Sequence, residues 1–267
     1  MEYKNCSLEE AQLRMLEILC EVDKICRKHN IKYWLDAGTL LGAIRHNGFI
    51  PWDDDIDIAM LREDYKKFKS IVDKELDEKY FCQSPVSDKY SEAPWIKIRD
   101  NNSIIGDIDS KEKSHRGLFI DILPYDDCNE FNKNIKKPIY NIINLKWKSE
   151  LPYKKKAKNI PRNIVLFLLK NTYKIFPYKS FIKKAYYKGD LGKDMNNEYI
   201  DYGIESPWNM KLKREYIFPL KEVEFSGFKF MAPNKYDKVL EVLYGDWGIL
   251  PPKEKQVPTH SSKIYIR

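Results

Sequence analysis

The stretch from Asp36 to Met60, DAGTLLGAIRHNGFIPWDDDIDIAM, decides the fold and indicates the chemistry of this chain. A small Gly-Thr turn opens it, an Asn-Gly turn follows, and a run of carboxylates then enters an apolar strand. Side chains alternate between the faces of an extended strand, so the pattern predicts that Asp53, Asp55 and Asp57 share one face. Carboxylates repeated about 7 Å apart on one face repel each other, and this favours a hard divalent cation among their oxygens. The alternative is an acidic solvated turn, which would not need the interleaved isoleucines.

A further candidate ligand, Asp121, stands in the apolar segment Gly117–Pro124, GLFIDILP. Burying a single carboxylate in such a strand is costly unless it is paired or bound to a metal. We therefore expect strand pairing to bring Asp121 next to Asp55 and Asp57.

Two basic residues, Lys97 and Arg99, alternate within the segment Trp95–Arg99, so both leave the same face of a predicted strand. They can neutralise a phosphate, with Arg favoured for a bidentate contact. They can equally be solvated residues of an edge strand, and the residues alone leave both interpretations open.

Three blocks of the chain resemble the LicD family of phosphotransferases, which is similar to the fukutin group and belongs to the wider nucleotidyltransferase fold. The blocks are Asp36–Met60, Gly117–Pro124 and Tyr244–Pro252, the last with the sequence YGDWGILPP. They occur in the order that the family has and cover the first half and the last quarter of the chain. Residues 131–195 carry no motif that matches.

The resemblance implies an α+β fold with a nucleotidyltransferase-like core, in which a mixed β-sheet has flanking helices and a basic helical insertion. We predict that residues 1–130 form the catalytic core and residues 131–195 the insertion. Residues 196–267 are expected to complete the core.

The spacing of apolar and polar residues predicts the elements of that core. A capping box at Ser7 and Glu10 starts a helix that runs to about His29. Further helices are predicted at Thr39–Arg45, Arg62–Leu76 and Asn234–Tyr244, the last with Asn234 as its N-cap and Gly245 as its stop. Strands are predicted at Ile31–Leu35, Tyr80–Gln83, Trp95–Arg99, Ser103–Ile108, Gly117–Ile122, Ile217–Phe225 and Phe228–Met231. The last two are expected to form a hairpin, and a turn at Asp100–Asn102 is expected to join another.

Composition is that of a folded globular protein. The 267 residues are 43% hydrophobic and 13% aromatic, which suffices for a core. The five cysteines are odd in number and lack CxxC spacing, which is typical of reduced thiols in a cytoplasmic protein. The chain opens on a polar amphipathic helix, so we expect no signal peptide. No apolar run reaches the roughly 18–20 residues of a membrane-spanning helix.

Charge is divided unevenly along the chain. Residues 131–188 hold 16 Lys and Arg and one acid, Glu150, so this block carries +15 and the remainder −8, for a net charge of +7. Apolar segments alternate with the lysines, which predicts basic amphipathic helices lying on an anionic membrane surface. The alternative is a helical lid whose apolar stripe packs on the core. No nucleic-acid-binding motif accompanies the charge, so we expect no nucleic acid as partner.

The family resemblance implies transfer of a phospho-alcohol from a CDP-activated donor to a sugar hydroxyl, with release of CMP. It implies Mg²⁺, or Mn²⁺ as the alternative, held by Asp55, Asp57 and Asp121. Asp53 is then a further ligand or the acceptor of the hydroxyl proton. The other candidate site residues bind the donor: Gly38 and Thr39 at a phosphate, Arg45, Lys97 and Arg99 as added positive charge, and Trp52 and His260. A choline head group would need an aromatic cage, for which the candidates are Trp52, Trp95, Tyr125 and Trp208.

The leading hypothesis is a phosphocholine transferase that takes CDP-choline and modifies a lipid-linked glycan, as a teichoic acid, capsule or lipopolysaccharide precursor. We expect it in the cytoplasm, peripheral on the inner face of the cell membrane. The same chemistry with CDP-ribitol or CDP-glycerol is the first alternative. An inactive membrane-associated scaffold and a nucleotidyltransferase that couples CTP to a phosphorylated alcohol are the others, and the intact carboxylates argue against the scaffold.

Overall fold

The computed structural model of the chain describes residues 2–91, 93–128, 198–258 and 263–267. The chain forms two compact units, Met1–Tyr125 with Leu212–Arg267 and Asp126–Lys211, and each is treated by itself. The predicted insertion at residues 131–195 and the candidate residue His260 lie outside the described residues.

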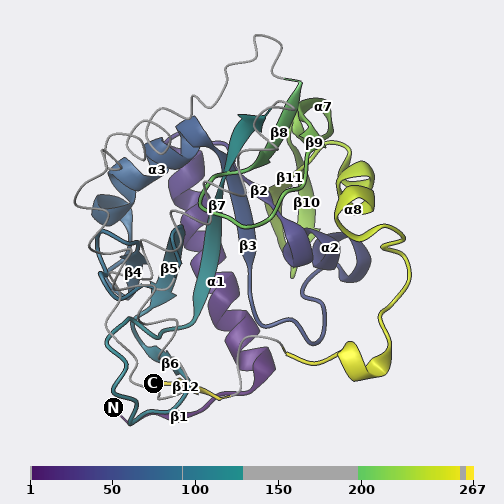
Figure 1. Cartoon of the computed structure of the whole chain (residues 1–267). Helices are drawn as coiled ribbons and strands as arrows, with labels where there is room; N and C mark the ends of the chain where they lie inside the picture. Colours follow the sequence, from purple (N-terminus) through teal and green to yellow (C-terminus); the bar gives the residue numbers. More distant parts are fainter. Residues whose placement is uncertain (1, 92, 129–197, 259–262) are drawn as a thin grey trace, which may run out of the picture. The chain divides into compact units, whose positions relative to one another are not determined.

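The first unit is built around a mixed β-sheet with the strand order β2-β3-β7-β5-β4 (Figure 1). These strands are Trp34–Leu35, Asp57–Leu61, Phe119–Cys128, Ile96–Asp100 and Tyr80–Gln83. β3 and β7 are parallel, whereas the other neighbours on this path are antiparallel. The predicted α+β class with a mixed sheet is therefore confirmed, while its assignment to the nucleotidyltransferase fold stays a prediction.

Two long helices pack on this sheet. α1, Leu8–Lys28, starts at Ser7 in the predicted capping box: the Glu10 amide donates to Ser7 Oγ at 3.1 Å, and the Ser7 amide donates to Glu10 Oε2 at 2.8 Å. α1 contacts β5 and α3, Arg62–Glu75, and α3 contacts β3 and β4. The predicted helices to His29 and from Arg62 are confirmed.

A short helix, α2, Ala37–His46, follows β2 directly and has Asp36 as its N-cap residue. It starts two residues earlier than predicted, which places the Gly-Thr pair inside its first turn. α2 ends at Asn47, which adopts the left-handed conformation with φ of 54°. It contacts β3, the strand β10 (Lys221–Phe225) and the helix α8 (Tyr236–Tyr244), so it joins the sheet to the C-terminal part of the chain.

That C-terminal part holds β9 (Leu212–Lys213), α7 (Arg214–Ile217), the hairpin β10–β11 (Lys221–Phe225 and Phe228–Ala232) and α8 (Tyr236–Tyr244). The predicted hairpin is confirmed around Ser226 and Gly227, whose φ values of 50° and 84° suit the tight turn. Gly245 ends α8 as predicted, with φ of 69°. The predicted cap at Asn234 is wrong, because Lys235 holds the N-cap position and caps with no side-chain bond.

A third sheet has the order β1-β12-β6, from Lys4–Asn5, Ile264–Ile266 and Ser103–Ile105. The hairpin predicted at Asp100–Asn102 is therefore wrong. β6 pairs with the C-terminal strand instead, and the Arg267 amide extends this pairing by donating to the Asn102 carbonyl at 2.9 Å. A partner more than 150 residues away cannot be inferred from local turn chemistry.

The described portion of the second unit includes β8, Tyr199–Tyr202. In it, buried Asp201 accepts hydrogen bonds from the amides of Tyr202 and Met210 at 2.7 and 2.8 Å.

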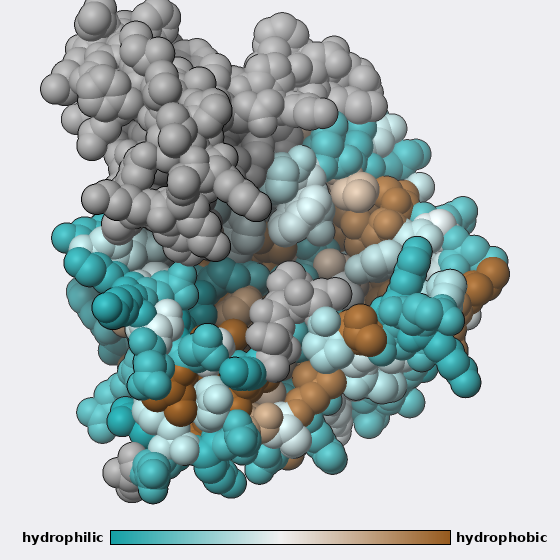
Figure 2. Space-filling model, turned by 60° about the horizontal axis from the view of Figure 1, so that its bottom comes forward, coloured by the Kyte–Doolittle hydropathy of each residue, from teal (hydrophilic) through white to brown (hydrophobic). Residues whose placement is uncertain are grey.

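On the face shown in Figure 2, hydrophobic residues form separate patches among hydrophilic ones. In the part of the chain that the structure describes, no helix is both long and apolar enough to cross a membrane.

Candidate active site

Three charged residues occupy paired positions on three adjacent strands. Asp57 of β3 pairs with Asp121 of β7, and Asp121 pairs with Lys97 of β5. Residues directly opposite each other in a sheet project from the same face, so the two carboxylates and the ammonium form a row across the sheet. The predicted approach of Asp121 to Asp57 through strand pairing is confirmed.

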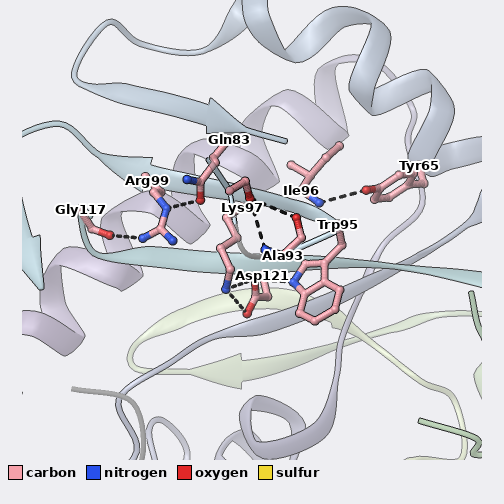
Figure 3. A network of polar contacts seen from close by, with 10 residues as sticks. Tyr65, Gln83, Ala93, Trp95, Ile96, Lys97, Arg99, Gly117 and Asp121 are labelled. Atoms are coloured by element: carbon pink, nitrogen blue, oxygen red, sulfur yellow. Dashed lines mark hydrogen bonds and ion pairs between the residues drawn. The ribbon is translucent and has the colours of Figure 1, made fainter. Parts of the chain in front are cut away.

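The Asp121 carboxylate is held from one side by two side chains of the Trp95–Lys97 segment (Figure 3). Lys97 Nζ lies 2.6 Å from Asp121 Oδ1 and 2.8 Å from Oδ2, and Trp95 Nε1 donates to Oδ1 at 2.7 Å. Burial lowers the pKa of Lys97, although the charge and hydrogen bonds of Asp121 oppose the shift. Trp95, predicted only as a cage candidate, thus contacts a candidate catalytic carboxylate.

The carboxylate run departs from the predicted strand. β3 begins only at Asp57, so Asp53 and Asp55 lie in the preceding loop and the expectation of one continuous strand face is wrong. The alternation in burial nevertheless extends back along the loop: Asp54 is 2% exposed, whereas Asp53, Asp55 and Asp57 are all partly exposed. A turn at Pro51 and Trp52 precedes them, and Trp52 is itself partly exposed.

The first turn of α2 is tied to this carboxylate segment. Thr39 Oγ1 accepts a hydrogen bond from the Asp57 amide at 2.8 Å. Asp53 Oδ2 lies 2.9 Å from the position that a Cβ atom on Gly38 would take, so the missing side chain lets the carboxylate approach the helix N-terminus. An anion there is favoured by the helix dipole. Gly38 and Thr39 are thus neighbours of the acids, and their predicted contact with a phosphate stays a prediction.

One buried acid beside the site was missed from the sequence. Asp36 is fully buried and accepts from the Tyr125 hydroxyl, with distances of 3.1 and 3.3 Å to its two oxygens. Tyr125 is 0% exposed, so its ring is not available to line an aromatic cage. The position of Asp36, two residues before Gly38, was the only sequence signal available.

Repulsion among the acids is concentrated on Asp57. Burial raises the pKa of Asp57 well above its usual range, and the neighbouring charges of Asp55, Asp121 and Asp36 raise it further, against a smaller opposing effect of Lys97. A divalent cation would relieve this repulsion, and carboxylate oxygens are the ligands that Mg²⁺ and Mn²⁺ prefer. The donor set therefore fits such an ion. Among the described residues, no three His, Cys, Asp or Glu side chains already stand in an arrangement that could hold a metal.

The two candidate arginines are anchored by the protein itself. Arg45 at the end of α2 donates from Nη1 to the Trp247 carbonyl at 3.2 Å and from Nε to His46 at 3.0 Å. Arg99 donates from Nη1 to the Gly117 carbonyl at 2.6 Å, and its Nε donates to the Gln83 side chain. Arg45 thus ties α2 to the loop after α8, whereas Arg99 is bound away from the Asp121 carboxylate. Their predicted contacts with the donor are not tested by these bonds.

A second residue missed from the sequence is Tyr244, the last residue of α8. Desolvation of its hydroxyl and the charges of four acids, Asp36, Asp57, Asp53 and Asp55, raise its pKa, although the residue as a whole is 45% exposed. Tyr244 also raises the pKa of Arg45, against the larger lowering by desolvation. Tyr244 opens the third block of the family resemblance, but its hydroxyl could not be assigned a neighbour from sequence.

The remaining cage candidate, Trp208, belongs to the second unit and packs on Tyr202 with ring centroids 5.4 Å apart.

Comparisons with known proteins define the class and then the family. Residues 30–166 match the family described as LicD/FKTN/FKRP, nucleotidyltransferase domain. The chain is 32% identical to lipopolysaccharide cholinephosphotransferase LicD of Haemophilus influenzae over 98% of its own length and 99% of that protein. Over 34 residues it is 53% identical to ribitol 5-phosphate transferase FKRP of Mus musculus and Homo sapiens, covering 13% of the chain and 7% of FKRP.

These matches and the acidic site define an enzyme of the transferase class. More particularly, the chain belongs to the LicD family.

Proposed function

We propose that this enzyme transfers phosphocholine from CDP-choline to a sugar hydroxyl of a teichoic acid, capsule or lipopolysaccharide precursor and releases CMP. The observation that carries the proposal is the 32% identity, along 98% of the chain, to a protein named as a cholinephosphotransferase. The row of Asp57, Asp121 and Lys97 across the sheet supports it, because phosphoryl transfer depends mainly on positioned charge. A nucleotidyltransferase-like core is part of the same proposal.

Asp55, Asp57 and Asp121 would hold Mg²⁺ or Mn²⁺. When bound, such an ion supplies Lewis-acid neutralisation of the charge that develops on the donor's phosphates. The first turn of α2, at Gly38 and Thr39, orients a phosphate through its backbone amides. Arg45 adds positive charge at the other end of the same helix.

The acceptor hydroxyl attacks the phosphorus that carries choline, and the bond from that phosphorus to the bridging oxygen breaks, so that CMP leaves with this oxygen. The hydroxyl proton must pass to a base, and we assign this role to Asp53. Its carboxylate lies against Gly38 in the first turn of α2, beside the segment where we place the donor's phosphate.

A second donor is favoured by one specific observation. The 34-residue segment shared at 53% identity with ribitol 5-phosphate transferase FKRP supports the same chemistry with CDP-ribitol. CDP-glycerol would be accommodated in the same way, since only the alcohol beyond the phosphate differs. Trp95 and Trp52, both partly exposed, are the side chains that would favour choline through cation–π contact.

We further propose that the enzyme works in the cytoplasm, peripheral on the inner face of the cell membrane, where a lipid-linked glycan acceptor would be anchored. The +15 charge of residues 131–188 supports this location, because each basic residue near an anionic leaflet contributes about 1 kcal/mol.

The test is a calorimetric titration of CDP-choline, CDP-ribitol, CDP-glycerol and CTP into the purified protein with Mg²⁺. The control is an Asp55→Ala/Asp57→Ala double variant. Binding of CDP-choline alone, lost in the variant, is the expected result. Preference for another CDP-alcohol keeps the mechanism and changes the substrate. Binding of CTP with release of pyrophosphate indicates a nucleotidyltransferase, and no binding at all indicates an inactive scaffold.

A further inference from the structure

We propose that Lys97 is an exchangeable counter-ion of Asp121: its ammonium gives way to the divalent cation and then pairs with an anionic oxygen of the donor. The inference rests on the proposed function, because it assumes that Asp121 is a metal ligand. It assigns Lys97 a role in controlling the metal, in addition to its predicted role as positive charge for a phosphate.

The contacts of Asp121 set up a competition. Lys97 Nζ bridges both oxygens at 2.6 and 2.8 Å, and Trp95 Nε1 shares Oδ1 at 2.7 Å. A divalent cation that binds this carboxylate must therefore lie close to an ammonium of the same sign. Coulomb repulsion at such a distance costs several kcal/mol even at the effective dielectric constant of about 20 typical of proteins. The ammonium relieves that repulsion by leaving Asp121.

The Lys97 ammonium can change its position, whereas the ring of Trp95 beside it is held more rigidly. The backbone of Lys97 is fixed between Gln83 of β4 and Asp121 of β7, but the ammonium ends a flexible four-carbon stem. Its Nζ also lies 3.6 Å from the centre of the Phe119 ring, which offers a cation–π contact that survives departure from Asp121. Trp95 is a rigid ring, so it would keep holding Oδ1.

Arg99 provides the contrast two residues further along the same strand. Its guanidinium is bound to the Gly117 carbonyl and to Gln83, and it lies 4.7 Å from the same ring. Of these two basic groups, the Lys97 ammonium is the one that contacts Asp121 (Figure 3), and Asp121 pairs with Asp57 of β3.

The test measures Mn²⁺ affinity without any donor, by electron paramagnetic resonance and calorimetry. Lys97→Gln removes the charge but keeps a hydrogen-bond donor for Asp121, and it is expected to bind Mn²⁺ about 10-fold more tightly. Lys97→Arg keeps the charge and forms a planar bidentate pair that releases less readily, so it is expected to bind Mn²⁺ more weakly. Lys263→Gln, which removes an exposed ion pair with Asp107 of 3.1 Å, controls for net charge.

A second titration adds CDP-choline at saturating Mn²⁺. Lys97→Gln is expected to bind CDP-choline about 10-fold more weakly, because a charge-assisted hydrogen bond to the phosphate is lost. Tighter metal together with weaker donor is a signature that a merely structural lysine would not give. Trp95→Phe, which keeps the charge, is expected to leave Mn²⁺ affinity within about threefold of the wild type.

The outcomes separate the two proposals. Unchanged or weaker Mn²⁺ binding by Lys97→Gln overturns the exchange while leaving the proposed function intact, and undiminished donor binding overturns its second half. If the wild type itself binds no Mn²⁺, the metal-dependent function fails first. Should Lys97→Gln not fold, as judged by circular dichroism, the Lys97→Arg variant decides: Mn²⁺ affinity equal to or above that of the wild type contradicts the exchange.

Discussion

At the scale of single residues, the site contains charged side chains whose arrangement is unfavourable for folding. Asp57 is partly buried beside other carboxylates, and the Lys97 side chain, 12% exposed, is paired with Asp121. Neither arrangement is what stability alone would select, since neighbouring carboxylates repel each other and an ion pair taken out of water loses hydration. Such conflicts between local charge and folding are concentrated at functional sites.

The raised pKa of Asp57 predicts a definite pH dependence of stability. A carboxyl whose pKa is higher in the folded than in the unfolded state opposes folding when it is ionised, so the cost is present above the folded pKa and disappears below the unfolded value. With EDTA present, Asp57→Asn is therefore expected to be more stable than the wild type at neutral pH, and the gap in Tm should close as the pH falls. Thermal melts between neutral and acid pH measure it.

Two controls bear on the Asp57 prediction. Asp107→Asn, at an exposed carboxylate paired with Lys263, should not reproduce the neutral-pH gain. Mg²⁺ should stabilise the wild type and not Asp57→Asn, because the ion relieves the same repulsion that the substitution removes. A Tm gap that stays constant across the pH range would contradict the assignment of the effect to Asp57.

Tyr244 supports a separate prediction about activity. Desolvation and the charges of four acids raise the pKa of the Tyr244 hydroxyl. A tyrosine hydroxyl is protonated at neutral pH, so it can donate a hydrogen bond to a phosphate bound beside those acids. Tyr244→Phe is expected to lower kcat/KM for CDP-choline about 10-fold, since a hydrogen bond to a charged group contributes about 1.5–3 kcal/mol. Tyr236→Phe is the matched control, because Tyr236 lies on the same helix and contacts Lys221 instead. Equal rates for the two variants would exclude Tyr244 from the site.

At the scale of elements, α2 connects the carboxylate segment around Asp57 to the C-terminal part of the chain. Asp36 holds its N-cap position, Thr39 accepts from the Asp57 amide, and Arg45 in its last turn donates to the Trp247 carbonyl. A helix of ten residues has little intrinsic stability, so its position depends on close packing against the following loop.

Gly42 is where that packing is tightest. A Cβ atom at this position would lie 2.5 Å from the Gly48 carbonyl oxygen and 3.1 Å from the Ile50 nitrogen, both of them backbone atoms that cannot rotate away. Gly42→Ala is therefore expected to reduce the free energy of unfolding by about 2–3 kcal/mol, as measured by urea denaturation. Gly248→Ala, whose nearest contact would be an ordinary 3.5 Å, should change it little. A stable Gly42→Ala would show that the loop can shift.

The elements also show what the sequence could and could not predict. Local signals sufficed for α1, with its capping box at Ser7, and for the approach of Asp121 to Asp57 through strand pairing, which a lone acid in an apolar strand suggested. They did not give the parallel direction of that pairing. They failed where a distant partner decides, as for β6, which pairs with β12 and not with β5. The roles of Trp95 and Tyr244 depend on contacts between segments more than 20 and 180 residues apart, and no pattern along the chain records such contacts.

At the scale of the whole molecule, the dominant feature is the separation of charge between the block at residues 131–188 and the remainder of the chain. The sequence alone supplies this separation, and composition predicts a polyanionic partner from it. The interpretation as membrane attachment makes a prediction that needs no knowledge of the catalytic chemistry.

The full chain is expected to co-float with vesicles containing 30% phosphatidylglycerol, and not with neutral phosphatidylcholine vesicles, because the attraction is electrostatic. Binding should fall steeply as salt rises and the Debye length shortens from about 10 Å at 0.1 M. Replacing Lys154, Lys155, Lys156 and Lys158 with Gln should weaken binding at least about 10-fold, since each contributes about 1 kcal/mol near the surface. A matched variant replaces four lysines with exposed side chains in the first unit, Lys24, Lys66, Lys238 and Lys263. If the two quadruple variants lose binding equally, net charge alone is responsible and the block at residues 131–188 is not a membrane-binding surface.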